Sequence, residues 1–396
     1  MSTHDPIVIV GAARTPIGGF QGDLKDVAAP ALGAAAIRAA VERAAIPPDA
    51  VQEVLFGCVL PAGIGQAPAR QAALGAGLPL STAATTINKV CGSGMKAVML
   101  AHDLLFAGTA AIAVAGGMES MSNAPYLLDR ARAGYRLGHQ RALDHIFIDG
   151  LEDAYDKGRL MGTFAEKCAQ SYAFSRAEQD EYAIASLTRA QRAIADGSFA
   201  QEIVPVTVQS GKTERTVDTD EQPLKARLEK IPALKPAFQP DGTVTAANSS
   251  SISDGAAALV LMRRSEADRR GLKPLAAIAG HATWAQEPDL FTTAPIGAIR
   301  ALCDRIGWPV DSIDLFEINE AFAVVAMAAM RDLRLPHERV NLHGGACALG
   351  HPIGASGARI LVTLLYALEQ SGRARGIASL CIGGGEATAV AVERIP

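Results

Sequence analysis

The apolar residues of this chain fall into two kinds of run. Residues 83–87 (Ala-Ala-Thr-Thr-Ile) form a short stretch that is β-branched and apolar, and residues 7–10 (Ile-Val-Ile-Val) form another. Such runs are typical of buried strands, whereas apolar residues at intervals of three and four, as from Met95 to Leu105, indicate a helix with a buried face. The pattern therefore predicts a chain in which strands and helices alternate.

Parts of the chain resemble each other, which indicates an internal repeat. Residues 49–56 resemble residues 311–316, and each segment leads from a Pro-containing turn into an apolar strand. Residues 92–119 resemble residues 354–386. In both, a Gly-rich start opens an apolar helix, and a strand then ends in a Gly-Gly-x-Glu turn. The matching order predicts a duplicated fold.

Strands that alternate with helices predict βαβ units and a mostly parallel sheet covered by helices on both faces. Functional sites in such sheets lie at the carboxyl ends of the strands. Cys91 and the loop 344–357 each precede a long predicted helix, and Cys381 lies near the end of the last buried strand. We therefore expect two half-sites that face each other across a pseudo-twofold axis.

Residues 120–247 differ in character and read as an insertion between the two halves. An amphipathic helix is predicted over residues 176–195, with Ser175 as its N-cap and Glu178 completing a capping box. The region is rich in basic residues, which either meet a phosphorylated ligand or form an ordinary solvated surface. These residues are Arg130, Arg132, Arg136, Arg141, Lys225, Arg227, Lys230 and Lys235.

Composition narrows the function classes. With 49% hydrophobic and 20% charged residues the chain can bury a large core, and its net charge of −4 gives no overall nucleic-acid footprint. The cysteines lack CxxC spacing, which argues against a zinc site or a disulfide scaffold and favours free thiols in a reducing compartment. There is no basic signal segment, and charges and Gly-rich turns interrupt the apolar runs. We expect a soluble cytoplasmic protein.

Cys91 is the first candidate for chemistry. It lies in residues 88–94 (Asn-Lys-Val-Cys-Gly-Ser-Gly), where the strand-like run gives way to the helix-like one. Unpaired N–H groups and the positive end of the helix dipole are expected to favour the thiolate, which is the nucleophilic form. The alternative is a buried cysteine that acts only as a small hydrophobic residue.

Three further motifs accompany this cysteine. Asn319 opens the sequence Asn-Glu-Ala-Phe after a predicted buried strand, His351 lies in a Gly-rich loop, and Cys381 precedes the run Ile-Gly-Gly-Gly. Together and in this order, the four motifs resemble the thiolase family of acetyl-CoA acetyltransferases and 3-ketoacyl-CoA thiolases. The resemblance extends from Arg14 to Gly385, over nearly the whole chain.

The resemblance implies the fold and a division of the chain. The expected fold is α/β, with two duplicated βαβαβ-type halves, mixed sheets packed in layers with helices, and an inserted coenzyme A-binding loop region. The N-terminal half is expected to comprise residues 1–119 and about 248–272, and the C-terminal half residues 273–396. Residues 120–247 would form the loop domain, which binds coenzyme A and makes oligomer contacts.

The resemblance also implies a chemical role for each motif. Cys91 would carry the acyl group, because a thioester keeps that group activated, and His351 would accept the thiol proton. Cys381 would be the acid and base at the α-carbon of the second substrate. His351 and a water held by Asn319 would form one oxyanion hole, and the N–H groups of Cys91 and Gly383 the other.

Coenzyme A thioesters would be the substrates, with no prosthetic group and no metal. Ser250 would bond the pantetheine through its hydroxyl, or serve only as a turn or N-cap residue before residues 256–258. Family members form dimers or tetramers, and a homotetramer is expected. The substrate-binding residues implied by the resemblance are Leu151, Met161, Phe238, Ala246, Ser250 and Phe322.

Some positions depart from the family pattern. Short-chain thiolases typically carry His where this chain has Leu160, the loop 151–160 is one residue longer, and Cys347 replaces a common Ile. An acetyl-CoA C-acetyltransferase is expected. The alternatives are a degradative 3-ketoacyl-CoA thiolase of broader chain length, a decarboxylating ketosynthase, a Cys/His hydrolase and a non-catalytic binding protein.

Overall fold

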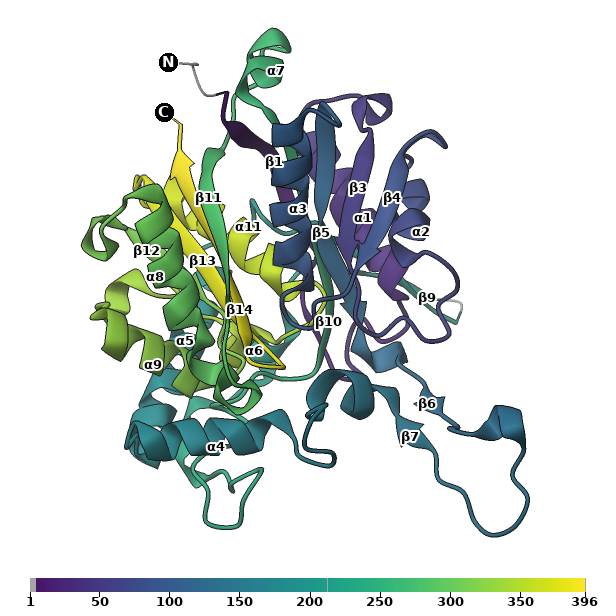
Figure 1. Cartoon of the computed structure of the whole chain (residues 1–396), viewed down its shortest axis with the longest axis vertical. Helices are drawn as coiled ribbons and strands as arrows, with labels where there is room; N and C mark the ends of the chain where they lie inside the picture. Colours follow the sequence, from purple (N-terminus) through teal and green to yellow (C-terminus); the bar gives the residue numbers. More distant parts are fainter. Residues whose placement is uncertain (1–4, 212, 396) are drawn as a thin grey trace.

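Two half-sheets meet through a short antiparallel pairing of β1 (Ile7–Arg14) with β11 (Ala276–Ala285). The computed structural model, shown in Figure 1, describes residues 5–211 and 213–395. The strand order is β12-β13-β14-β11-β1-β10-β5-β3-β4, with β2 beside β10. The remaining strands are β2 (Gly18–Gly19), β3 (Glu53–Gly57), β4 (Ala83–Ile87), β5 (Ile112–Ser120), β6 (Tyr126–Leu127), β7 (Leu143–Asp144), β8 (Val206–Ser210), β9 (Thr213–Val217), β10 (Ser253–Arg263), β12 (Leu315–Ile318), β13 (Arg375–Ile382) and β14 (Glu386–Arg394).

The helices cover and separate the two half-sheets (Figure 1). They are α1 (Ala29–Arg43), α2 (Pro68–Gly75), α3 (Ser93–Ala107), α4 (Met161–Ser171), α5 (Arg176–Ala195), α6 (Glu221–Lys225), α7 (Arg264–Arg269), α8 (Ala294–Ile306), α9 (Ala323–Leu333), α10 (Ala346–Leu349) and α11 (Ser356–Gln370).

The sheet is mixed rather than mostly parallel. β3 pairs in parallel with β4 and β5, and β12 with β13, as the βαβ pattern predicts. The centre of the sheet is antiparallel, because β1, β10, β11 and β14 pair with their neighbours in opposite directions. The prediction of a mostly parallel sheet is therefore wrong, and the expected mixed-sheet α/β architecture is confirmed.

The predicted internal repeat is visible in the sheet order. Reading outward from the centre, β1-β10-β5-β3 matches β11-β14-β13-β12, and the two inner helices α3 and α11 correspond. These helices touch through equivalent glycines: a Cβ at Gly94 would lie 2.9 Å from the Ala358 nitrogen, and a Cβ at Gly357 would lie 2.4 Å from the Met95 nitrogen. The reciprocal contact is what a pseudo-twofold axis requires.

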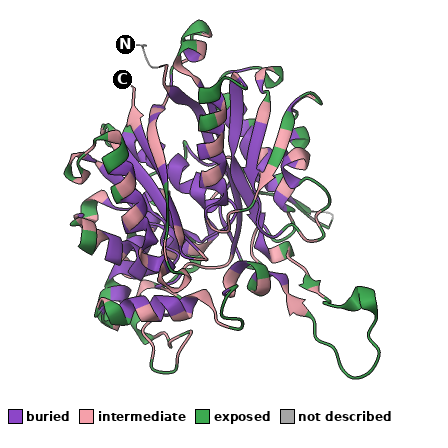
Figure 2. Ribbon diagram, viewed as in Figure 1, coloured by how far each residue is buried: buried purple, intermediate pink, exposed green. Residues whose placement is uncertain are grey.

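Three hydrophobic layers stabilise this arrangement. One core packs α1 and α2 against the N-terminal half-sheet, a second packs α8 and α9 against the C-terminal half-sheet, and a third surrounds α3 and α11 between them. Every residue from 356 to 368 is buried, as expected for a helix enclosed on all sides (Figure 2). The N-terminal turns of α3 and α11 are thereby fixed side by side.

The two Gly-Gly-x-Glu segments differ, although both were predicted as turns. Residues 116–119 continue β5, whereas residues 383–385 form the turn between β13 and β14. Strand β5 is covered on both edges by β10 and β3, so its glycines extend the ladder. The hairpin residues Gly384 and Gly385 instead have φ values of +93° and +87°, which side chains disfavour.

The insertion contains the predicted helix and an exposed arm. α5 spans residues 176–195 and begins with the expected capping box of Ser175 and Glu178. The short strands β6 and β7 form the base of an arm that projects from the body, and residues 128–142 on it are all exposed (Figures 1 and 2). The arginines of this segment thus lie on a solvated surface.

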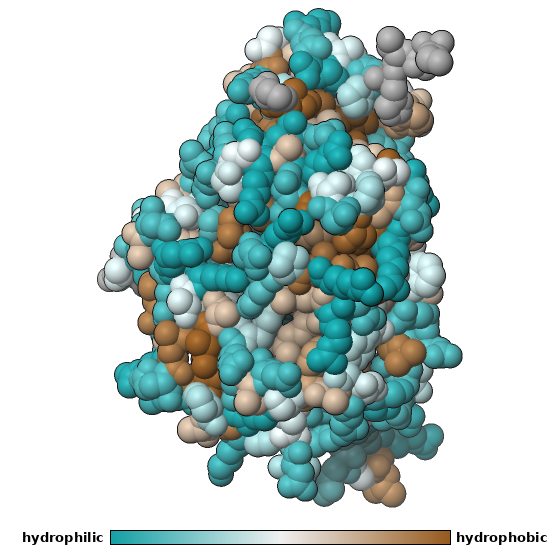
Figure 3. Space-filling model, turned by 90° about the vertical axis from the view of Figure 1, so that its left-hand side faces the viewer, coloured by the Kyte–Doolittle hydropathy of each residue, from teal (hydrophilic) through white to brown (hydrophobic). Residues whose placement is uncertain are grey.

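Among the residues that the structure describes, one apolar segment is long and apolar enough for a membrane-spanning helix, contrary to the expectation that charges and Gly-rich turns interrupt every such run. It covers Val90–Ala107, with a mean hydropathy of 1.2, and half of it is buried. This segment is α3, which packs against β5, β3 and α11 in the core. The face drawn in Figure 3 is mainly hydrophilic, with hydrophobic residues in separate areas.

The loop that carries His351 reaches the N-terminal half through a recess formed by glycines. The Gly354 carbonyl oxygen would lie 2.5 Å from a Cβ at Gly57, 3.0 Å from one at Gly94 and 2.0 Å from one at Gly117. Real Cβ atoms do not approach a carbonyl oxygen as closely as at Gly57 and Gly117, so these two positions require glycine, and Gly94 requires it because of its contact with the Ala358 nitrogen. The recess fixes the height of the loop above the sheet.

We predict that Gly117→Ala lowers the free energy of unfolding by about 3 kcal/mol, because its methyl group overpacks the recess against backbone that cannot move away. Urea denaturation followed by circular dichroism measures the change. Gly75→Ala is the control, since its new methyl would meet only the Ala34 side chain at 3.1 Å, and it should cost less than a third as much. An equal decrease in the free energy of unfolding in the two variants would contradict the proposed close contact between Gly117 and the Gly354 carbonyl.

Candidate active site

Cys91 lies immediately before α3, as predicted, with Gly92 as the N-cap residue. The preceding residue, Val90, has a φ of +46°, which is rare and strained for a β-branched side chain. The Ser93 hydroxyl holds this bend: it donates to the Val90 carbonyl at 2.6 Å and accepts from the Lys89 N–H at 2.8 Å. The sharp bend turns the thiol toward the opposite half of the molecule.

The thiol lines a cavity of about 350 Å³. All of the predicted site residues except Asn319 line it, although they come from both halves and the insertion. The predicted residues in its wall are Cys91, Leu151, Met161, Phe238, Ala246, Ser250, Phe322, His351, Cys381 and Gly383.

The cavity also contains apolar residues that the sequence did not single out as site residues. Phe147 comes from a π-helical turn, Phe291 precedes α8, Met121 follows β5, and Ile353 belongs to the loop that carries His351. Only Ile353 belongs to one of the four motifs, and the folding of the chain brings it together with the other three. The wall around the thiol is therefore largely hydrophobic.

His351 presents an unprotonated nitrogen to the cavity. Its Nδ1 lies 2.5 Å from the Ser356 hydroxyl oxygen, and that hydroxyl lies 3.0 Å from the Pro352 carbonyl. A carbonyl only accepts, so all three groups are satisfied when the hydroxyl donates to Pro352 and Nδ1–H donates to the hydroxyl. Nε2 then carries the lone pair, and it has no hydrogen-bond partner among the residues that the structure describes.

Burial keeps this imidazole neutral. It lowers the pKa of His351 to about 3, and the nearby positive charge of Arg359 acts in the same direction. A neutral imidazole with a free Nε2 lone pair is a proton acceptor, which is what activation of a thiol requires.

The thiol of Cys91 is also neutral at rest, contrary to the expectation for a helix N-terminus. Burial raises its pKa to about 11, and hydrogen bonds from the N–H groups of Gly383 and of Cys91 itself only partly offset that rise. Desolvation thus outweighs the helix terminus, and the thiolate forms only when a base takes the proton. The same two N–H groups are those expected to form an oxyanion hole.

Cys381 lies close enough to Cys91 for the two sulfurs to affect each other. Burial raises the pKa of Cys381 well above its usual value, and negative charge on Cys91 raises it further. At rest Cys381 is a neutral thiol, which can donate a proton.

Asn319 lies behind the cavity rather than in its wall. It follows β12, is buried, and within residues 5–211 and 213–395 its side-chain Nδ2 has no hydrogen-bond partner. The Arg359 guanidinium lies 3.5 Å from its Oδ1 and, as noted, its charge also acts on His351. The unpaired donor Nδ2 and the unpaired Nε2 of His351 are buried polar atoms that call for a functional explanation.

The next residue, Glu320, holds this segment in place. Its carboxylate accepts from the Tyr182 hydroxyl at 2.9 Å, the Ser186 hydroxyl at 2.7 Å, Asn341 at 2.8 Å and the Cys347 N–H at 3.1 Å. A buried carboxylate is stable only with such donors. In this motif, Asn319 therefore lies near the cavity, and the hydrogen bonds of Glu320 hold the segment in position.

Two carboxylates anchor the loops that carry Cys91 and His351. Glu386 forms an ion pair with Lys89 and so ties the cysteine loop to the β13–β14 turn. Glu119, which is fully buried, accepts the N–H groups of Val59 at 3.0 Å, Leu60 at 3.1 Å and Gly354 at 2.9 Å. These residues end the two repeated Gly-Gly-x-Glu segments, and each connects one half to the other.

Ser250 has a structural contact as well as a place in the cavity wall. Its N–H and its hydroxyl both donate to the Ala321 carbonyl at 3.0 Å. Residues 256–258 lie in β10, so the alternative N-cap role before them is wrong. Cys347 is partly buried and its thiol donates to the Glu320 carbonyl at 3.7 Å.

A second hollow of about 420 Å³ adjoins the first and shares Ala246 and Ser251 with it. Its wall includes Lys225, Arg227 and Lys230. The basic stretch of the insertion thus lies beside the cavity that Cys91 lines. Lys225 also forms an ion pair with Glu221.

Comparison with known proteins gives matches over nearly the whole chain. Residues 7–265 match the family described as "Thiolase, N-terminal domain" and residues 272–394 the family "Thiolase, C-terminal domain". The chain is 48% identical to "Acetyl-CoA acetyltransferase" of Schizosaccharomyces pombe, covering 98% of this chain and 99% of the relative. It is 52% identical to "Acetyl-CoA acetyltransferase 1" of Arabidopsis thaliana, covering 98% and 94%. The solved structure of acetyl-CoA acetyltransferase from Syntrophomonas wolfei superposes with a TM-score of 0.95 at 38% identity, covering 99% of this chain and 100% of that one.

We predict that Glu119 makes stability fall as pH rises. Burial raises the pKa of Glu119 to about 7, so between about pH 4.5 and 7 the folded protein binds more protons at this site than the unfolded chain does. The free energy of unfolding of the wild type relative to Glu119→Gln should therefore fall by up to about 3 kcal/mol over that range. Urea titrations at closely spaced pH values measure this difference.

The exposed Glu229 supplies the control for this experiment. The wild type and Glu229→Gln should differ by a nearly constant amount over the same pH range. A difference between the wild type and Glu119→Gln that stays constant or grows with pH would show that the buried carboxyl group is not the one that titrates.

Proposed function

The chain belongs to the thiolase family, and we propose that it is an acetyl-CoA C-acetyltransferase, which converts two acetyl-CoA into acetoacetyl-CoA and CoA and catalyses the reverse reaction. The observation that carries the proposal is the convergence of Cys91, His351 and Cys381 on one hydrophobic cavity. The relatives and solved structures that match nearly the full chain are named for this activity.

In the first half-reaction, Cys91 takes an acetyl group from acetyl-CoA. His351 Nε2 accepts the thiol proton while the sulfur attacks the thioester carbonyl. The carbonyl re-forms as the bond to the coenzyme A sulfur breaks, and that sulfur leaves with the proton of Cys381. The products are CoA, acetyl-Cys91 and a Cys381 thiolate, with the first proton held on His351.

In the second half-reaction, the Cys381 thiolate removes a proton from the methyl carbon of another acetyl-CoA. The resulting carbanion attacks the acetyl-Cys91 carbonyl, a carbon–carbon bond forms, and the carbon–sulfur bond breaks. Cys91 leaves as a thiolate and recovers its proton from His351. Both thiols and the imidazole thus return to the neutral state that their burial favours.

Two sets of donors would stabilise the negative charge that develops on oxygen. The N–H groups of Cys91 and Gly383, which face the sulfur, would bind the tetrahedral oxyanion on the acetylated cysteine. Nε2–H of protonated His351 and a water bound to Nδ2 of Asn319 would bind the enolate oxygen. This assignment is supported by the absence of protein partners for both buried nitrogens among the described residues.

Coenzyme A would extend from the cavity through the adjoining basic hollow. The hydrophobic wall, including Leu151, Met161 and Phe238, suits the pantetheine arm, and Lys225, Arg227 and Lys230 suit the phosphates. Coenzyme A would act as substrate and product only, and the proposed chemistry requires no prosthetic group.

We also propose a cytoplasmic homotetramer built as a dimer of dimers and acting in fatty acid metabolism. The projecting arm supports self-association, because it exposes apolar side chains where a monomer would normally bury them: Leu128 is 59% exposed and Leu137 is 96% exposed. The absence of a nucleic-acid or membrane partner remains an expectation from composition.

We predict that the two cysteines separate the half-reactions. Cys91→Ser should abolish the acetyl adduct seen by intact-protein mass spectrometry and lower condensation by at least a thousandfold, because a buried hydroxyl is a far weaker nucleophile than a thiolate. Cys381→Ser should still acquire the adduct, with its carbon–carbon bond formation reduced by a similar factor.

Cys303→Ser provides a matched control, since Cys303 is a buried thiol on α8 outside the cavity. It should keep both half-reactions. Retained acetylation in Cys91→Ser, or parallel loss of acetylation and condensation in Cys381→Ser, would contradict the assigned roles.

A degradative thiolase of broader chain length is the second candidate, and Leu160 favours it. This residue lines the catalytic cavity together with Phe147 and Phe291, where short-chain thiolases typically place a histidine. An apolar side chain there removes a polar group and leaves a wall that can contact additional methylene groups.

We predict that Leu160→His lowers kcat/KM for 3-ketohexanoyl-CoA relative to acetoacetyl-CoA by about tenfold, because a polar ring replaces hydrophobic contact with the longer chain. Thiolysis rates across a series of ketoacyl-CoA lengths measure the ratio. Leu160→Met, which keeps the wall apolar, should leave the ratio within about twofold of the wild type. An unchanged ratio in Leu160→His would exclude this wall as the chain-length determinant.

A further inference from the structure

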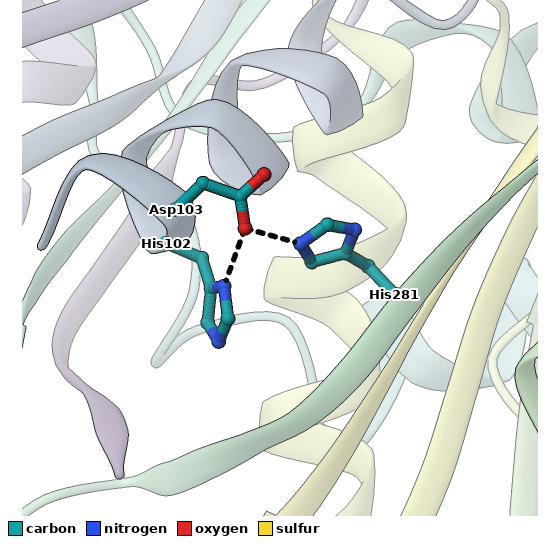
Figure 4. Close-up of side chains that lie close together, drawn as sticks. All are labelled: His102, Asp103 and His281. Carbon is teal, nitrogen blue, oxygen red and sulfur yellow. Dashed lines mark hydrogen bonds and ion pairs between the residues drawn. The ribbon is translucent and has the colours of Figure 1, made fainter. Parts of the chain in front are cut away.

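Three side chains that the proposed reaction does not use meet at the opposite end of α3. His102 and Asp103 come from α3 and His281 from β11, so the cluster joins the two halves of the fold (Figure 4). Oδ1 of Asp103 lies 3.0 Å from Nδ1 of His102 and 2.9 Å from Nε2 of His281. The three donor atoms lie within 4.8 Å of one another.

The fold places these groups together for a local reason on each element. Ala282 on β11 is buried against the outer layer, so the neighbouring His281 points to the other face, toward α3. Consecutive residues on a helix do not normally face each other, yet the Asp103 carboxylate reaches back to His102. The two imidazole rings meet edge to face, with centroids 5.0 Å apart.

The cluster is shielded on one side and open on the other. The side chains of His102 and His281 are only 17% and 13% exposed, whereas that of Asp103 is 54% exposed. An ion could therefore reach the carboxylate from solvent and keep water ligands on that side, while the imidazoles hold it against the protein.

The spacing and chemistry of the donors suit a metal ion. Two ligand atoms that lie about 2.1 Å from an ion are about 3.0 Å apart at right angles and about 3.4 Å apart in a tetrahedron, so the distances from Oδ1 to each imidazole nitrogen are within a few tenths of an ångström of both geometries. Two imidazoles and one carboxylate are preferred by first-row transition ions rather than by Mg²⁺ or Ca²⁺. We propose that His102, Asp103 and His281 bind a divalent transition ion such as Zn²⁺, which clamps α3 to β11.

The proton balance of binding is simple. A carboxylate only accepts hydrogen bonds, so in the metal-free protein each imidazole presents N–H to Oδ1. When the ion takes those two nitrogens, each proton moves to the other ring nitrogen, which is Nε2 in His102 and Nδ1 in His281. Two hydrogen bonds are thus replaced by three metal–ligand bonds without a change in the charge of the side chains.

The site is separate from the reaction cavity. Cys91 precedes the first turn of α3, and His102 follows it by eleven residues, or roughly 17 Å along a helix. Because the ion would join α3 to β11, its binding should stabilise the contact between the two halves without occupying the substrate cavity.

Isothermal titration calorimetry of the purified full chain with Zn²⁺ tests the proposal. The wild type should show one saturable site per chain and a melting temperature that rises with Zn²⁺ concentration. Co²⁺ bound at the same site should give visible bands without the intense charge-transfer absorption of thiolate ligation. His281→Ala and His102→Ala should each weaken binding at least tenfold.

His281→Gln separates metal binding from folding, because its amide can still donate to Asp103 while it is a poor metal ligand. Its melting temperature should be close to that of the metal-free wild type and should not rise when Zn²⁺ is added. His139→Ala, which removes an exposed histidine of the arm, should bind as the wild type does. A wild type without a saturable site, or unaltered affinity in the His102 and His281 variants, would overturn the proposal.

Discussion

The Gly354 carbonyl lies in a recess formed by Gly57, Gly94 and Gly117, and the rest of the site depends on that contact. Without side chains at these positions, the histidine loop of one half approaches the backbone of the other closely enough for Glu119 to accept the Gly354 N–H. The groups in this contact belong to the backbone, which has no side-chain rotamers. The contact therefore fixes the distance between the cysteine loop and the histidine loop more rigidly than side-chain packing would.

Burial determines how the reactive groups are used. It holds Cys91 and Cys381 as thiols and His351 as a neutral imidazole, so none of these three groups carries a desolvated charge in the resting protein. In the proposed reaction, a positive charge on His351 and a negative charge on a cysteine appear together and only transiently, when protons move between groups that line the same cavity. Arg359, buried behind the site, opposes protonation of the imidazole and so favours return of the proton.

The duplicated architecture gives its two halves unequal tasks. Equivalent helices α3 and α11 cross at Gly94 and Gly357, yet one follows the Cys91 loop and the other follows the histidine loop. The equivalent carboxylates have also diverged: Glu119 binds backbone N–H groups, whereas Glu386 pairs with Lys89. α3 serves both the reaction cavity at its start and the His-Asp-His cluster near its end.

The local pattern of apolar, polar and capping residues was sufficient to predict the bounds of several helices and strands. The strand Ala83–Ile87 and the helix Arg176–Ala195 with its capping box have the boundaries that the sequence predicts, because hydrogen bonds and caps within a few residues define them. The repeat and the four motifs likewise indicated Cys91 and His351 on loops and Cys381 near the end of a buried strand, in half-sites that face each other. Family membership then followed from residues that are readable in order along the chain.

Other features required the tertiary structure. The antiparallel centre of the sheet depends on pairing between β1 and β10, which are about 250 residues apart, and the neutral state of Cys91 depends on desolvation by the opposite half. The same holds for Phe147 in the cavity wall and for His281 beside α3. Sequence determines which groups are present and how each segment folds locally. Only long-range packing decides which of them lose water and which come within bonding distance, because burial and distance are properties of the assembled chain.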